Sequence, residues 1–134
     1  MSSNRIKISK EATAHLSIIK GRTGLTPNIL CRIAFCLSLN EPSALPQTQY
    51  DETGQEFNRH TLTGEYDSFF VALLKERMIR DGLDPEKHSI IQFKGHLNRG
   101  VGILFSRVKH IGDLHTLLPS DADNKIKAGR SICH

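Results

Sequence analysis

The alternation of polar and apolar residues changes period near the start of the chain. In residues 5–9 charged or polar residues alternate with isoleucine, which is typical of a strand with one buried face. From residue 9 onward the apolar positions follow helical spacing, and Ser9 stands where an N-cap is expected. Thr26 followed by Pro27 predicts the start of a second helix, which ends before Pro42. The first forty residues therefore predict the order strand, helix, helix.

The expected strand needs a partner, because a strand of this length cannot satisfy its own backbone hydrogen bonds. The simplest partner is the same strand of a second copy, as in a ribbon-helix-helix dimer, which can lay its ribbon in a DNA groove. In that arrangement Ile6 and Ile8 would point into the dimer core, whereas Arg5 and Lys7 would point outward. An ordinary edge strand with solvated charges fits the same pattern equally well.

A long polar connection is expected to follow the second helix. Residues 41–64 are acidic and poor in aliphatic side chains, although residues 56–62 alternate enough for a short strand or an extended arm. Residues 65–80 then carry a wide apolar stripe at helical spacing, which predicts another helix.

The last third of the sequence predicts two helical segments with a break between them. Asp84 and Pro85 form a start signal like that of Thr26 and Pro27. Two glycines within residues 98–102 are expected to interrupt the helix with a turn, after which helical spacing resumes up to Pro119.

These segments together predict a mainly α fold: a short N-terminal strand followed by helices, with a ribbon-helix-helix-like core and additional C-terminal helices. Residues 1–118 are expected to form one helical DNA-binding domain, and residues 119–134 a polar C-terminal tail. The composition, 38% hydrophobic and 24% charged, is ordinary for a globular protein. No apolar run is long enough to span a bilayer and no signal peptide is evident, so we expect a cytoplasmic protein with no membrane contact.

Charge is distributed in blocks. Residues 1–40 hold six Lys or Arg against one acidic residue, residues 41–67 hold one against six, and residues 68–112 hold eight against four. Two basic blocks separated by an acidic one indicate a polarised surface, for which a polyphosphate is the commonest partner. Two solvated basic faces without a partner would give the same pattern.

The sequence offers little for catalysis or for metal binding. Cys31 and Cys36 lie five apart in an expected helix, as do His110 and His115, so neither pair shares a face. The glycine-containing residues 95–102 lack the lysine of a phosphate-binding loop. We therefore expect no catalytic residue, no metal and no cofactor. His15 is expected to be a hydrogen-bonded core histidine rather than a ligand.

Basic side chains are the better candidates for function. Arg99 is expected in the glycine-flanked turn, where its guanidinium and backbone N–H groups could hold a phosphate, although the turn could also be purely structural. The side chains expected to contact DNA phosphates are those of Arg5, Lys7, Lys10, Lys20, Arg22, Lys94, Arg99 and Lys109.

Three segments together resemble the DndE family of DNA sulfur-modification proteins: RTGLTPNILCR (residues 22–32), NRHTLTGEY (residues 58–66) and KGHLNRGV (residues 94–101). The resemblance extends over roughly residues 5–118. It implies a role in bacterial DNA phosphorothioation, in which sulfur replaces a non-bridging phosphate oxygen. In such systems sulfur mobilisation and ATP use are attributed to other components, namely a cysteine desulfurase, an iron-sulfur sulfurtransferase and an ATPase. The resemblance implies that this small member is a homo-oligomeric DNA-binding component with a fold related to ribbon-helix-helix proteins.

The expected function is therefore that of a non-enzymatic subunit that holds double-stranded DNA for the modification machinery, with a preference for nicked duplex as an extension of this expectation. We expect self-association into a dimer or homotetramer, with Gly21 and Gly24 at a subunit contact in addition to Ile6 and Ile8. A plain interhelix turn would also explain the two glycines. The alternatives are a sequence-specific ribbon-helix-helix repressor reading bases through Arg5 and Lys7, and a protein scaffold of the modification complex.

Overall fold

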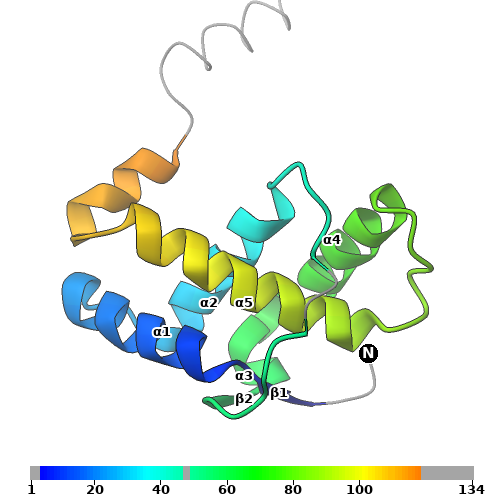
Figure 1. The fold of residues 1–134 in the computed structure, drawn as a ribbon, viewed down its shortest axis with the longest axis horizontal. Coiled ribbons are helices and arrows are strands. Elements are labelled where there is room, and N and C mark those ends of the chain that lie inside the picture. The colour runs from blue at the N-terminus through cyan, green and yellow to red at the C-terminus, as the bar shows by residue number, and fades with distance from the viewer. Residues whose placement is uncertain (1–3, 47–48, 119–134) are drawn as a thin grey trace, which may run out of the picture.

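The protein is described from a computed structural model, which covers residues 4–46 and 49–118. Helices α1, α2 and α5 form the body of the molecule, α5 runs through it, and α4 lies beyond the N-terminal end of α5 (Figure 1). In chain order the elements are β1 (Arg5–Lys7), α1 (Lys10–Thr23), α2 (Pro27–Leu39), β2 (Glu56–Asn58), α3 (Arg59–Thr63), η1 (Gly64–Tyr66), α4 (Asp67–Arg80), α5 (Ser89–Arg107) and η2 (Ile111–Leu117). The mainly α fold with a short N-terminal strand is confirmed.

The ends of the first two helices are the predicted ones. The Ser9 hydroxyl accepts a hydrogen bond from Ala12 N–H at 3.0 Å, and Gly24 ends α1 in the left-handed conformation with φ 75°. Thr26 accepts from Ile29 N–H at 3.4 Å, with Pro27 at the first helical position. Local capping chemistry therefore fixes where the backbone leaves one helix and enters the next.

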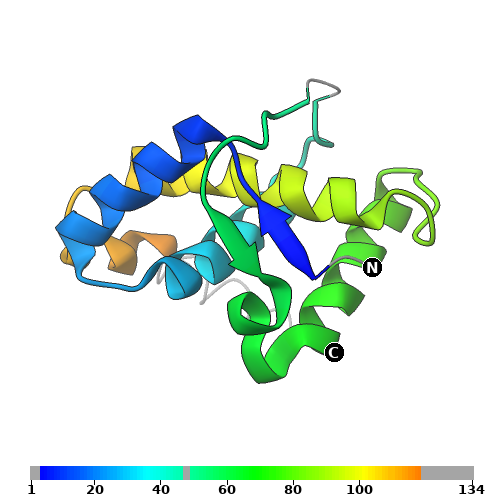
Figure 2. The same ribbon diagram turned by 90° about the horizontal axis from the view of Figure 1, so that it is seen from below.

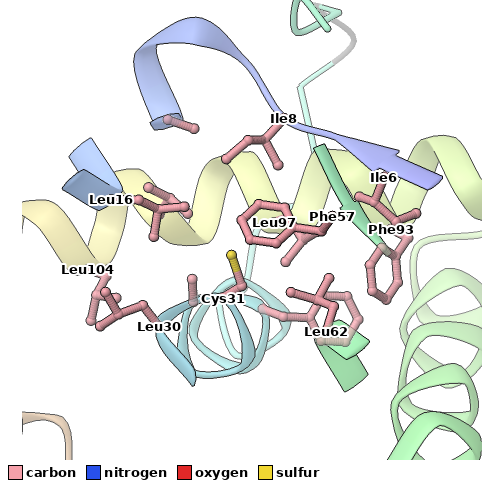
Figure 3. Packing of buried hydrophobic residues seen from close by; sticks show 14 of the residues in the cluster. Ile6, Ile8, Leu16, Leu30, Cys31, Phe57, Leu62, Phe93, Leu97 and Leu104 are labelled. Atoms are coloured by element: carbon pink, nitrogen blue, oxygen red, sulfur yellow. The ribbon is translucent and has the colours of Figure 1, made fainter. Parts of the chain in front are cut away.

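The partner of the first strand differs from the prediction. β1 pairs antiparallel with β2 of the same chain, so that Ile6 lies opposite Phe57 (Figure 2). The expectation that a second copy supplies the partner of this strand is therefore wrong, because β2 of the same chain supplies it. Ile6 and Ile8 are 0% exposed in the core of that chain, so the expectation that they form the oligomer contact is also wrong (Figure 3).

The core lies where α2 and α5 cross beneath the strand pair. Leu30 and Cys31 of α2 face Leu97 and Leu104 of α5 across this layer (Figure 3). A Cβ built on Gly100 would overlap the carbonyl oxygen of Ala34, so glycine is required where the two helices touch.

The predicted break in the last third is wrong, because α5 is continuous through Asn98, Gly100 and Gly102. The start predicted at Asp84 is also misplaced. Residues 84–88 form turns, and α5 begins at Ser89 after His88, whose φ is 60°. Packing of Gly100 against α2 offsets the low helix propensity of glycine.

The remaining predictions are confirmed in part. The helix expected at residues 65–80 is present as α4 after one 3-10 turn, but Tyr66 and Phe69 of its predicted apolar stripe are 54% and 59% exposed. The helical segment expected up to Pro119 divides into α5 and the 3-10 helix η2. The predicted tail of residues 119–134 lies outside the described residues. Among the described helices, none combines the length and hydropathy that a bilayer span requires.

Candidate nucleic-acid interface

The acidic connection folds back onto the start of α1 and fixes it. Asp51 Oδ2 accepts from the backbone N–H of Lys10 at 2.9 Å, and Thr13 Oγ1 accepts from Gln55 N–H at 2.8 Å. Gly54 lies against the backbone of residues 8 and 9, where a Cβ would overlap carbonyl oxygens. The hydrogen bonds to Asp51 hold the pKa of its carboxyl below the usual range. A negative charge is thus placed at the positive end of the helix dipole.

Five of the predicted DNA-contacting residues lie on β1 and α1, and all but Arg22 are exposed. Arg5 and Lys7 are exposed on β1, and Lys10 and Lys20 are exposed on α1. The ion pairs between described residues do not include Lys7, Lys10 or Lys20. At 1.5 Å per residue, Lys10 and Lys20 are about 15 Å apart along the helix axis. The ammonium groups of Lys7 on β1 and of Lys10 and Lys20 on α1 are therefore available to anions.

A second basic group gathers around one aromatic ring, and we call it the Phe105 cluster: Phe105, His15, Arg22 and Lys109. His15 stacks on Phe105 with ring centroids 3.9 Å apart and an angle of 11°. The Arg22 guanidinium and the Lys109 ammonium lie 5.2 Å and 5.1 Å from the centroid of the same ring. Cations at this distance from an aromatic face are attracted by its quadrupole. The cluster thus brings together one predicted residue from each basic block.

The Phe105 cluster lies where the C-terminal ends of α1 and α5 come side by side (Figures 1 and 2). Two residue pairs within the cluster could be predicted from their spacing in the sequence. His15 and Arg22 are seven apart in a helix, and Phe105 and Lys109 are four apart, so each pair falls on one face. The prediction missed Phe105 because no local pattern shows which two helix faces will meet. His15 is a half-buried stacked residue and not the expected core histidine.

Two predicted residues are engaged inside the chain. Lys94 Nζ pairs with Glu52 Oε1 at 2.5 Å. Arg99 lies in α5 rather than in a turn, and its guanidinium donates to Ser38 and to the carbonyls of Ser43 and Ala44. The predicted phosphate-holding turn is therefore wrong. Arg99 instead satisfies carbonyl groups at the C-terminal end of α2, where a cation also complements the helix dipole.

The nucleophilic side chains of α2 are protonated or buried. Burial raises the pKa of the Cys31 thiol to about 12, and partial desolvation also raises the pKa of Cys36, which is exposed, so both thiols are protonated at neutral pH. Ser38 and His96 are hydrogen-bonded at 2.8 Å, but both are 0% exposed. No three His, Cys, Asp or Glu side chains gather as a metal site in the described part of the chain.

Gly21 and Gly24, the predicted subunit contact, face open space. No atom of the described chain lies within 4 Å of a Cβ built at either position. Gly24 needs its left-handed conformation to end α1, whereas Gly21 lies within the last turn and has a helical conformation. Nothing in the described chain accounts for glycine at residue 21.

Comparison with known proteins gives a consistent match. The family model described as DNA sulphur modification protein DndE matches residues 5–111. The crystal structure of DndE from Escherichia coli B7A, involved in DNA phosphorothioation modification, is similar with a TM-score of 0.64 and 27% identity, covering 78% of this chain and 98% of that one. A crystal structure of a DndE G21/24K mutant has a similar fold, with a TM-score of 0.62 and 24% identity over 78% of this chain and 99% of that one. Among curated proteins, none matches the chain.

Proposed function

Because this chain belongs to the DndE family of DNA sulphur modification proteins, we propose that it is a non-catalytic subunit that binds duplex DNA for the phosphorothioation machinery in the cytoplasm. The observation that carries the proposal is the placement of the exposed cations. Lys7, Lys10 and Lys20 have no ionic partner among the described residues, and Lys20 lies in the last turn of α1, as does Arg22 of the Phe105 cluster. Such a surface contacts phosphates without reading sequence.

A non-catalytic role is supported by the state of the nucleophiles. Both thiols are held protonated by burial, and the Ser38–His96 pair has no access for a substrate. Sulfur and ATP chemistry would then belong to other components of the machinery. The repressor alternative loses its basis, because β1 is paired inside the chain and offers no two-chain ribbon.

The proposal is tested by removing single charges. We expect Lys10→Ala and Lys20→Ala each to weaken binding of a duplex at low salt by roughly three- to ten-fold, because each removes a phosphate contact. Lys87→Ala is the matched control, since Lys87 is also exposed but lies in the turn before α5. Fluorescence anisotropy of a labelled duplex measures all three variants. Equal affinities for the wild type and the two α1 variants would contradict the proposal.

Self-association is a further part of the proposal. Glycine at residue 21 lowers helix propensity by about 1 kcal/mol relative to alanine, and the described chain offers no compensating contact. We propose that a second copy approaches the α1–α2 turn here and forms a dimer or tetramer. Sedimentation velocity of Gly21→Leu and the wild type tests this, and an unchanged assembly state in the variant would contradict it.

A further inference from the structure

A groove runs between α1 and α5 beside the proposed DNA surface. It encloses about 350 Å³, which is at the lower end of the usual range of small-molecule sites, roughly 300 to 1,000 Å³. The side chains that give it chemical character are those of Glu11, His15, Tyr50, Arg99 and Ser106, with Gly102 on the α5 side. No function described so far uses this groove.

Aromatic rings bound the groove. His15 lines the groove, and its imidazole is stacked on the ring of Phe105. Tyr50 contributes a second ring and is 38% exposed. The hydrogen bonds of the neighbouring Asp51 to α1 hold Tyr50 in place. Rings presented in this way offer stacking surfaces to a flat ligand.

The polar groups of the groove include both an acceptor and a donor. The Glu11 carboxylate is 82% exposed and its Oε1 lies 4.0 Å from His15 Nε2. The Arg99 guanidinium donates four hydrogen bonds within the chain, one from Nε, two from Nη1 and one from Nη2. A guanidinium has five N–H groups, so one N–H group of Nη2 is not used by these bonds. An accepting carboxylate disfavours a phosphate and favours a neutral ligand that carries an amino group.

Gly102 keeps the groove open. It lies inside α5, where glycine costs about 1 kcal/mol relative to alanine, and no described atom lies within 4 Å of a Cβ built there. Packing within the chain therefore does not require glycine at this position, in contrast to Gly100. A side chain at residue 102 would project into the groove.

We propose that this groove receives one unpaired nucleobase of DNA, which stacks on the rings of His15 or Tyr50 and donates its exocyclic amino group to Glu11. The inference rests on the proposed DNA binding, because the basic residues of α1 and the Phe105 cluster would hold the backbone at the rim of the groove. Carboxylates accept from the N4 amino group of cytosine. Cytosine thus fits the groove, whereas thymine has no amino group to offer.

The test compares duplexes of equal length that are intact, nicked, or carry a one-nucleotide gap opposite cytosine or thymine, each titrated with the full chain. We expect the cytosine gap to bind at least roughly five-fold tighter than the nicked duplex, and the thymine gap to gain less. Gly102→Leu should abolish this gain while leaving the affinity for nicked duplex unchanged. Ala72→Leu, which places the same side chain at an exposed position of α4, is the control.

Glu11→Gln is a second variant at an exposed side chain, and it should reduce the discrimination of cytosine from thymine even if Gly102→Leu fails to fold. A cytosine gap bound no tighter than the nicked duplex would overturn the inference, and so would a gain that survives Gly102→Leu. In both cases binding of the intact duplex would leave the proposed function standing. Absence of binding to every duplex would overturn both.

Tighter binding of nicked than of intact duplex in the same titration would support the preference for nicked DNA, and equal binding would contradict it.

Discussion

Ser38 and Arg99 lie against the buried His96 imidazole. Ser38 Oγ accepts from Arg99 Nε at 2.8 Å and is hydrogen-bonded to His96 Nδ1, also at 2.8 Å. The other ring nitrogen, His96 Nε2, has no hydrogen-bond partner among the described residues. Burial, together with the charges of Arg99 and Arg77, lowers the pKa of His96 to about 4.

The lowered pKa of His96 predicts that the stability of the fold decreases in acid. Between pH 6.5 and 4 the unfolded chain binds a proton at His96 that the folded chain does not, so stability falls as the pH falls. The contribution of His96 to the free energy of unfolding should decrease by about 3 kcal/mol from pH 7 to pH 4. Urea unfolding at several pH values measures this in the wild type, in His96→Gln and in the exposed control His60→Gln.

The slope of the free energy of unfolding against pH decides between the two outcomes. His96→Gln should show a weaker loss of stability on acidification than the other two proteins. A His96→Gln curve parallel to that of the wild type would show that the His96 imidazole does not titrate differently on unfolding.

Sequence reasoning at the residue scale identified which side chains carry charge but not which of them are already engaged. Arg99 and Lys20 look alike as isolated basic residues. Only the fold places Arg99 against the end of α2 and leaves Lys20 exposed. Such partners are separated by more than fifty positions and leave no local pattern.

Single elements were more predictable than their partners. The alternation in residues 5–9 correctly predicted a strand with one buried face, and the caps of α1 and α2 were predicted from local hydrogen-bonding chemistry. The pairing of β1 with β2 was not predicted, because β2 is only three residues long and runs directly into α3. Residues 56–62 were expected to form a short strand or an extended arm, and the strand covers Glu56–Asn58, but so short a pattern does not indicate which strand it pairs with.

Gly100 and Gly102 show why the continuity of α5 was missed, and they give a matched pair of variants. Gly100→Ala should destabilise the fold by about 1–3 kcal/mol, because its methyl group would overlap the Ala34 carbonyl and push α2 from α5. Gly102→Ala should stabilise it by up to about 1 kcal/mol, because it faces open space and alanine favours helix. Urea unfolding of the two variants measures the difference. Effects of equal sign would contradict the described packing of α2 on α5.

At the scale of the whole molecule, folding redistributes the charge blocks seen in the sequence. Several charges of the acidic middle block are used internally: Glu52 pairs with Lys94, Asp67 pairs with Arg59, and Asp51 holds the start of α1. Basic side chains of α1 are left exposed, and those at the end of α5 join them at the Phe105 cluster. The sequence predicted a polarised surface, but only the fold shows which basic residues form it.

The central claim is that this surface binds DNA through phosphate contacts, and the dependence of duplex affinity on salt tests it most directly. If Lys7, Lys10, Lys20, Arg22 and Lys109 each contact one phosphate, a plot of log K against log salt should have a slope of about −4 or steeper. Replacing both Lys10 and Lys20 by alanine should reduce its magnitude by about 2. A nearly flat plot for the wild type, or a slope unchanged in the double variant, would contradict the account.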